Sequence, residues 1–136
     1  MYEIKRTGKR ITDEVRITEG ERQLVLPVSL SVDSITRQLP ACQRALLAAR
    51  ERVSEMRQTD DAEASQNAHE ALVGAVQALL HLIFGDEGAK NIQSFYGGDM
   101  LDALSDLAPY VAQVIIPQVT EAQQALADTY RQAGAK

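Results

Sequence analysis

The chain has 136 residues and a single cysteine, which leaves room for one ordinary domain and excludes both an intramolecular disulfide and an all-cysteine zinc site. Apolar residues make up 45% of it, a globular composition, and the formal net charge of −5 argues against a general nucleic-acid binder, whose affinity comes from cationic contacts to phosphate. No apolar run approaches the roughly 20 residues of a membrane span, and the charged N-terminus lacks a signal-peptide core. We therefore expect a cytoplasmic protein that contacts neither nucleic acid nor membrane.

The first thirty residues predict strands, because apolar and polar residues alternate there and glycines punctuate the pattern. Strands are expected at about residues 2–6, 11–18 and 22–30, with a tight turn at Gly20. Pro27 cannot donate a ladder hydrogen bond, so the last strand is expected to be an edge strand or to carry a bulge. A sheet of this size is marginal by itself and needs a helix against its apolar face.

From Val32 the apolar period changes to that of a helix. Apolar residues follow at alternating spacings of four and three, a seven-residue repeat held over three repeats. Ser31 or Asp33 can cap the start, and Pro40 either opens the long helix after a short first piece or kinks it. The stripe is either a face of the intramolecular core or a seam for another helix, in a second copy or in a partner chain. Its members are Ile35, Leu39, Cys42, Leu46, Ala49, Val53 and Met56.

Further helices are expected after this first one. Polar residues 58–61 predict a break between helices. The next helix is expected at about residues 62–84, because its apolar residues keep to one face. Gly85 is well placed as the residue after its end, since glycine commonly terminates helices. A short helix at about residues 86–96 is expected to follow.

The last forty residues continue the helical pattern. Gly97 and Gly98 predict the end of the short helix, and Asp99 is expected to cap the next one. Pro109 and Pro117 each predict a kink or a restart, since proline cannot continue the backbone hydrogen bonding of a helix. The final stretch is weakly amphipathic.

The expected fold is mainly α and forms one domain over residues 1–136. A small N-terminal antiparallel hairpin or meander (1–31) is followed by a bundle of about four to five helices (32–136). Charge is uneven: residues 1–58 carry 11 basic and 8 acidic side chains (+3), and residues 59–136 carry 3 basic and 11 acidic (−8). This asymmetry suits a head-to-tail or helix-to-helix contact between copies, and it also suits a solvated face on each half.

No combination of side chains predicts an active site. His69 and His81 lack the i, i+4 partner that a metal site on a helix requires. The three aspartates of Asp99–Asp106 share a helix face, which offers fewer oxygen ligands than calcium needs. Cys42 occupies an apolar helix position and is expected to be a small core residue. We therefore expect no enzymatic activity, no cofactor and no metal.

Short motifs in the second half follow a familiar order. They are Leu82-Ile83-Phe84-Gly85, Phe95-Tyr96-Gly97-Gly98-Asp99, Leu107-Ala108-Pro109-Tyr110 and Val114-Ile115-Ile116-Pro117, together with the opening Tyr2-Glu3-Ile4-Lys5. In this order they resemble small tail assembly chaperones of long-tailed phages and prophages of Gram-positive bacteria. The resemblance covers the first few residues and roughly residues 70–120. The chain departs from that pattern between Lys5 and Leu30 and at Pro40.

The resemblance implies a non-enzymatic tail morphogenesis protein that binds helical segments of the tape-measure protein in the host cytoplasm. The alternatives are a structural tail or head–tail protein retained in the virion, or a bacterial helical adaptor protein. Expected partners are the tape-measure protein, other tail proteins and further copies of this chain in a homo-oligomer. The residues expected at a partner or self-association surface, of which the aromatic ones suit the core as well, are Ile35, Leu39, Leu46, Val53, Met56, Phe95, Tyr96 and Tyr110.

Overall fold

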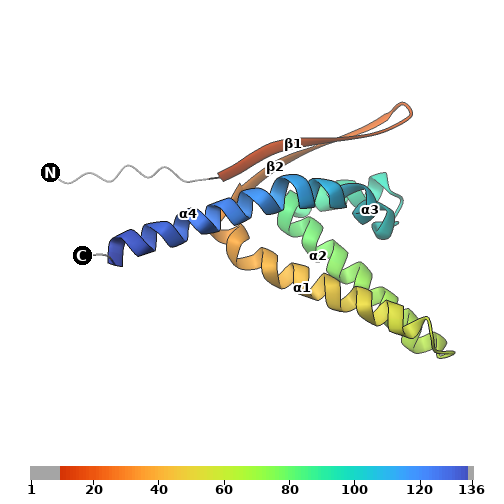
Figure 1. Cartoon of the computed structure of the whole chain (residues 1–136). Coiled ribbons are helices and arrows are strands. Elements are labelled where there is room, and N and C mark those ends of the chain that lie inside the picture. Colours follow the sequence, from red (N-terminus) through yellow and green to blue (C-terminus); the bar gives the residue numbers. More distant parts are fainter. Residues whose placement is uncertain (1–9, 135–136) are drawn as a thin grey trace.

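The computed structural model describes residues 10–134 (Figure 1), so the strand expected at 2–6 lies outside the described residues. The mainly α class with an N-terminal hairpin is confirmed, although three long helical stretches replace the expected four or five helices. The elements are β1 (Arg10–Glu19), β2 (Arg22–Ser31), α1 (Val32–Met56), α2 (Ala62–Phe95), α3 (Met100–Tyr110), the π-helical turn η1 (Val111–Ile115) and α4 (Ile116–Gly134).

The two strands form an antiparallel hairpin that turns at Gly20. This glycine has a φ of 61°, whereas every described non-glycine residue, including Glu21 beside it, has a negative φ. A positive φ at the first central position alone matches a type II′ turn, whose twist suits tightly joined strands. The ladder is continuous and places Pro27 opposite Glu14 without a bulge. Of the two alternatives for Pro27, the edge strand is therefore correct.

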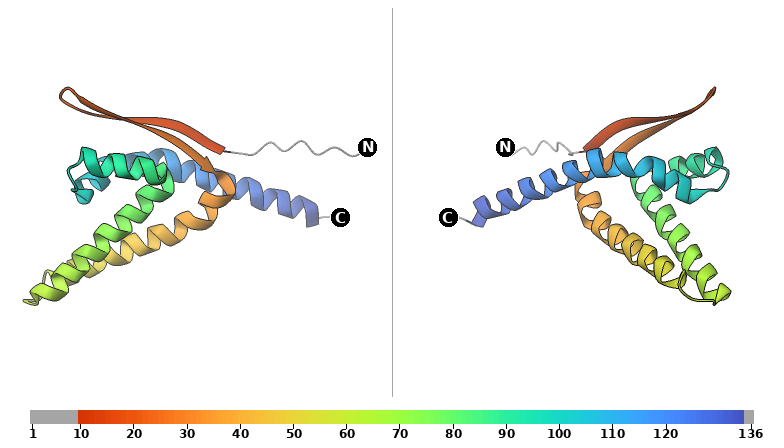
Figure 2. Two further views of the ribbon diagram at one scale, coloured as in Figure 1. Left: turned by 180° about the vertical axis from the view of Figure 1, so that it is seen from behind. Right: turned by 45° about the vertical axis from the view of Figure 1, so that its right-hand side comes forward.

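One face of the hairpin is apolar and covers the helices. β2 rests on α2 and on the start of α1, whereas β1 lies farther out (Figures 1 and 2). The helices thereby supply the cover that a two-stranded sheet needs. The buried hairpin residues are Ile11, Leu26, Val28 and Leu30, and Val15, Ile17 and Leu24 are half-buried.

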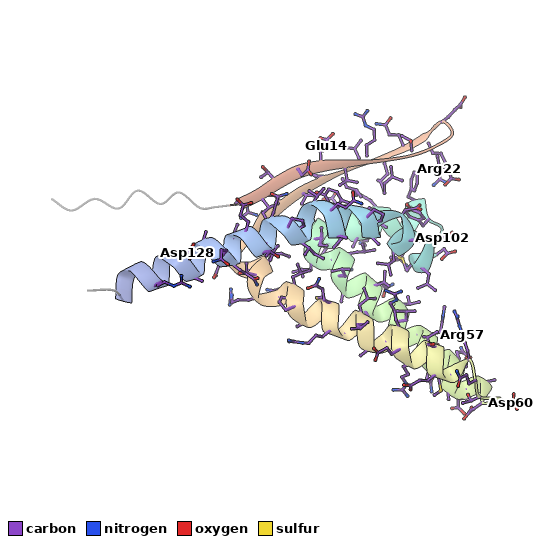
Figure 3. The ribbon with its side chains drawn as sticks, in the orientation of Figure 1. Glu14, Arg22, Arg57, Asp60, Asp102 and Asp128 are labelled. Carbon is purple, nitrogen blue, oxygen red and sulfur yellow. The ribbon has the colours of Figure 1, made fainter. Side chains whose placement is uncertain are left out.

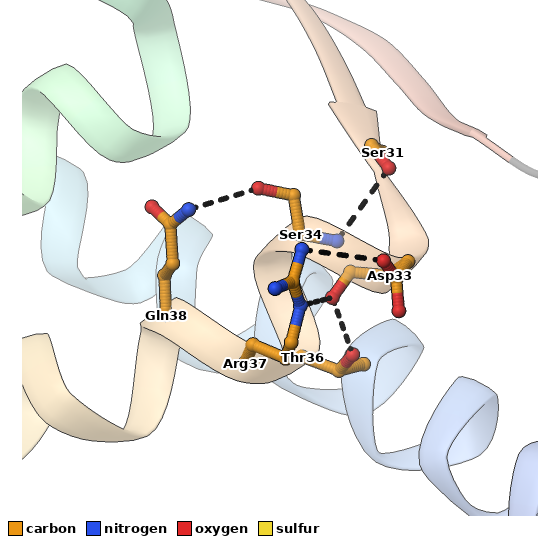
Figure 4. Close-up of polar contacts among 6 residues, drawn as sticks. All are labelled: Ser31, Asp33, Ser34, Thr36, Arg37 and Gln38. Carbon is orange, nitrogen blue, oxygen red and sulfur yellow. Dashed lines mark hydrogen bonds and ion pairs between the residues drawn. The ribbon is translucent and has the colours of Figure 1, made fainter.

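Helix α1 begins at a serine cap and continues through a proline. The Ser31 hydroxyl accepts a hydrogen bond from the Ser34 N–H at 3.5 Å (Figure 4), so Ser31 is the cap. Pro40 lies inside the helix, where it cannot donate to the Thr36 carbonyl. The helix continues for four more turns beyond this point, because its apolar stripe is held by packing.

The stripe of α1 faces α2 within the same chain. The two helices lie side by side as an antiparallel helical hairpin that projects from the rest of the molecule (Figures 1 and 2). Ile35 and Leu39 are each 1% exposed, so neither is accessible to a second chain. At these two positions the stripe is therefore a face of the intramolecular core and not a seam for a second chain. Ala49 is also buried, and the half-buried members are Cys42, Leu46, Val53 and Met56.

Helix α2 changes direction at Gly85, where the sequence predicts a helix end. Its φ of 76° and ψ of 175° belong to a region that only glycine adopts freely. The segment after the bend runs beneath β2. There Gly88 is buried, and a Cβ built on it would lie 2.8 Å from Phe84 Cβ and 3.9 Å from Leu26 Cδ2. Glycine at this position therefore leaves room for Phe84 of the same helix, whereas Leu26 of the hairpin lies at an ordinary van der Waals distance.

Helices α3 and α4 join through η1 into one continuous rod, so neither Pro109 nor Pro117 restarts the helix as the sequence suggests. In the π turn, the Ile116 N–H donates to the Val111 carbonyl five residues back. Buried residues along the rod are spaced by four, and in a helix of about 3.6 residues per turn such a series drifts by roughly 40° per step. The π turn has more residues per turn, which compensates for this rotation and keeps the series on the buried face of the rod. The series is Leu107, Val111, Ile115 and Val119.

By length and composition, α2 is also apolar enough to cross a membrane, with a mean hydropathy of 1.3 over 18 residues. The core helix of a soluble protein meets the same criterion. In this fold Val76 and Leu80 of α2 are buried in the core cluster that includes residues of the hairpin and the other helices. Packing within the chain thus buries part of this apolar window, 39% of it.

The burial of the α1 stripe predicts unequal effects for two leucines of the same helix. Leu39→Ala should lower the free energy of unfolding by about 2–5 kcal/mol, because it opens a cavity in the core. Leu47→Ala, at a side chain that is 57% exposed, should change it by less than about 0.5 kcal/mol. Urea unfolding followed by circular dichroism measures both. Equal effects would contradict the assignment of the stripe to the core.

Candidate interaction surface

Two aromatic residues at the end of α2 connect it to the hairpin tip and to α3. The Arg22 guanidinium lies 4.4 Å from the centre of the Phe95 ring and donates to the Phe95 carbonyl at 2.8 Å. Tyr96 packs edge-on against Phe95, with ring centres 5.5 Å apart, and donates its hydroxyl to Asp106 at 2.8 Å. Partial burial, and after it this hydrogen bond, raises the pKa of Tyr96. Both rings therefore make contacts within the chain.

Tyr110 connects the other end of the hairpin to the helices. Its ring stacks on Phe84 with centres 6.4 Å apart, and its hydroxyl donates to Asp13 of β1 at 3.0 Å. Burial is the largest cause that raises the pKa of Tyr110, and the hydrogen bond to Asp13 adds to it. Because the phenol must keep its proton to donate, this contact holds β1 against the rod only while Tyr110 is neutral.

These contacts show whether the aromatic residues of the expected partner surface pack within the chain or are exposed. Phe95, Tyr96 and Tyr110 are half-buried and engaged with the hairpin or α3. The core alternative fits their positions better than the alternative of exposed binding anchors. The acceptors of the two tyrosine hydroxyls do not follow from local spacing, since Asp13 lies 97 residues from Tyr110 and Asp106 lies ten from Tyr96.

Two other reactive side chains of the described residues, His81 and Cys42, have particular surroundings. His81 Nδ1 lies 2.8 Å from Asp86 Oδ1, a pair that the i, i+4 test misses because the bend at Gly85 brings a residue five positions away into reach. Burial raises the pKa of the Cys42 thiol, which disfavours the nucleophilic thiolate. Among residues 10–134, no group of His, Cys, Asp and Glu side chains is placed to hold a metal ion.

An open groove of about 570 Å³ lies between α1, α2 and the α3–η1 rod. Leu72 of α2 is buried at its floor, and Leu101 and Leu104 of α3 are half-buried in its wall. Small exposed residues continue that wall along the rod, and Arg50 of α1 lies at the opposite rim. The wall and rim residues beyond the leucines are Ser105, Ala108, Pro109, Ala112 and Gln113.

Two other hollows are less suited to holding a partner. One of about 720 Å³ follows α4, but its described lining, from Ile116 to Asp128, comes from that helix alone and offers no opposing wall. A smaller one of about 380 Å³ lies beside the hairpin tip and is mostly polar. Its arginine, Arg22, is already engaged with Phe95. Of these three hollows, the three-helix groove is the best suited to hold a partner.

Comparisons with known proteins supply no relative. No family model matches the chain, and no curated protein or solved structure matches it significantly. One charged residue, Arg50, is among the described residues that line the groove. Arg57 lies seven residues farther along, at the distal end of the helical hairpin (Figure 3), and is not part of this lining.

The Tyr110–Asp13 contact predicts a specific alkaline dependence of stability. The pKa of Tyr110 is higher in the folded chain than in the unfolded one, so its contribution is present below the ordinary tyrosine pKa of about 10 and is lost as the pH rises above it. Tyr110→Phe should therefore be less stable than the wild type at neutral pH, and the difference should shrink above pH ~10. Urea unfolding at a series of pH values measures this. Parallel pH profiles for the two proteins would contradict it.

Proposed function

We propose that this protein is a non-enzymatic tail assembly chaperone, which holds helical segments of a tape-measure protein in the groove between α1, α2 and α3–η1. The observation that carries the proposal is the groove itself, an apolar surface left open by three helices. A groove of this kind takes the apolar face of an amphipathic helix, whose contacts recur at i, i+3, i+4 and i+7. The motifs from Leu82 to Pro117, which resemble those of tail assembly chaperones, support the same class.

The groove has the properties that a temporary helix holder needs. Ala108 and Ala112 present small side chains, so a partner backbone can approach closely. Leu101 and Leu104 are half-buried and offer apolar contact without a deep, enclosed pocket. Arg50 at the rim can pair with a carboxylate of the partner, which favours orientation more than affinity. Binding of this kind is reversible, as release to the assembling tail tube requires, and it takes place in the host cytoplasm.

A pair of alanine substitutions tests the groove as the binding site. Ala108→Arg places a long charged side chain on the groove wall and should weaken capture of a tape-measure fragment about tenfold or more. Ala41→Arg makes the same change at an exposed position of α1 that does not line the groove, and capture should be unchanged. Both residues are exposed helix positions, so both variants should melt within a few degrees of the wild type.

The assay is co-expression with the tape-measure protein of the same phage, followed by purification of the complex. If the tape measure is equally soluble without this chain and no complex forms, the chaperone proposal fails. Mass spectrometry of purified particles then tests the alternative of a virion component. A chaperone should be absent from particles, whereas a structural tail protein should be present in a fixed number of copies.

A further inference from the structure

Strand β1 is a long edge without a neighbour in the described chain. Its ten residues pair with β2 on one side, while β2 is the strand that rests on the helices (Figures 1 and 2). An uncovered edge presents a row of backbone N–H and C=O groups and is a template for another strand. The open edge of β1 therefore favours the addition of a strand there.

The two edges of the hairpin are not equivalent, because Pro27 blocks the edge of β2. Pro27 lies opposite Glu14 in a continuous ladder and has no N–H, so this pair cannot be one that exchanges two hydrogen bonds. Its nitrogen therefore faces the free edge of β2, where an added strand would find no donor. On β1 the same alternation directs the Glu14 N–H to the free edge. Consistently, this N–H donates to Asp13 Oδ1 at 2.8 Å and not to β2.

The charges on the outer face of β1 are complementary to a second, antiparallel copy of the same strand. A twofold axis at Val15 places Glu14 opposite Arg16 of the second copy, and Arg16 opposite its Glu14. Shifting the axis one residue earlier sets Glu14 against Glu14, and shifting it one residue later sets Arg16 against Arg16. Like charges directly opposite each other destabilise a sheet, whereas opposite charges stabilise it, so the register about Val15 is favoured over these two neighbours.

We propose that β1 is a homodimer interface: β1 of two copies pair antiparallel about Val15 and form one continuous four-stranded sheet. The edge-facing residues from Thr12 to Thr18 exchange backbone hydrogen bonds, and the Glu14 N–H moves from Asp13 to the Arg16 carbonyl of the second copy. The Asp13 carboxylate keeps its contact with Tyr110. The proposal goes beyond helix capture, because it leaves both grooves open and joins two of them in one particle.

Charge reversal tests the register without disturbing the fold. Glu14 lies on the outer side of the hairpin (Figure 3), and neither its side chain nor that of Arg16 makes a hydrogen bond or ion pair with another described residue. Glu14→Arg and Arg16→Glu should each weaken dimerisation about tenfold or more, since each creates two like-charge pairs across the axis. The double variant restores both pairs and should dimerise like the wild type. Sedimentation velocity over a concentration series measures all four proteins.

A cysteine pair tests the position of the axis. In a Cys42→Ser background, Val15→Cys should form an intermolecular disulfide on mild oxidation, because the two positions face each other as a close, non-hydrogen-bonded pair. Val25→Cys, on the outer face of β2 and away from the axis, should remain uncrosslinked. Equal crosslinking of the two variants would overturn the proposed axis.

The charge variants decide the proposal even if the cysteine variant does not fold. A wild-type chain that stays monomeric over the whole series, or a double variant that does not recover, overturns the β1 interface. This result is independent of the helix groove: Glu14→Arg should still capture the tape-measure fragment, and Ala108→Arg should still dimerise. Failure of one proposal is therefore distinguishable from failure of the other.

Discussion

The bend of α2 at Gly85 determines where every other element can pack. Before the bend, α2 lies against the apolar stripe of α1; after it, the helix turns under β2 and leads into α3. The backbone there adopts a conformation that residues with a Cβ disfavour, and one turn later the missing Cβ of Gly88 leaves room for Phe84. Without this change of direction β2 would lose the part of α2 that packs against it.

The candidate interaction surfaces follow from that arrangement. Because α3 returns alongside the helical hairpin, Leu72 and Leu104 meet at a groove that no described element fills. Because β2 is the strand that packs against α1 and α2, β1 is the outer strand of the hairpin. Contacts at the two ends of the hairpin, Arg22 with Phe95 and Asp13 with Tyr110, hold it over the helices. The helix groove and the strand edge thus lie on different elements of one rigid frame.

Local patterns were sufficient for much of the fold. The alternation before Ser31, the stripe that begins at Ile35 and the glycine at position 85 each express a local preference that the tertiary structure keeps. Of the two alternatives for Pro109 and Pro117, a kink or a restart, the restart does not occur, because packing of one continuous buried face outweighs the hydrogen bonds that the prolines remove. The π turn lies between the two prolines and absorbs the mismatch.

The candidate site was less accessible from the sequence. The apolar pattern of α1 is compatible with packing against a partner helix or against α2. Only the tertiary structure shows that α2 packs against it. The Asp13 and Asp106 acceptors of the two tyrosines likewise depend on which surfaces the fold joins. The groove has no sequence signature, since its walls come from three helices that are distant along the chain.

Two glycine substitutions in α2 test the central role of the bend most directly. Gly74 lies in the straight part of the helix and a Cβ there meets nothing, so Gly74→Ala should raise the free energy of unfolding by about 0.5–1 kcal/mol. A Cβ at Gly85 also meets nothing, yet its φ of 76° disfavours alanine, and Gly85→Ala should lower that free energy by about 1–3 kcal/mol. Urea unfolding of the two variants measures both. If both substitutions raise the stability alike, α2 does not depend on the bend, and this account of the fold is wrong.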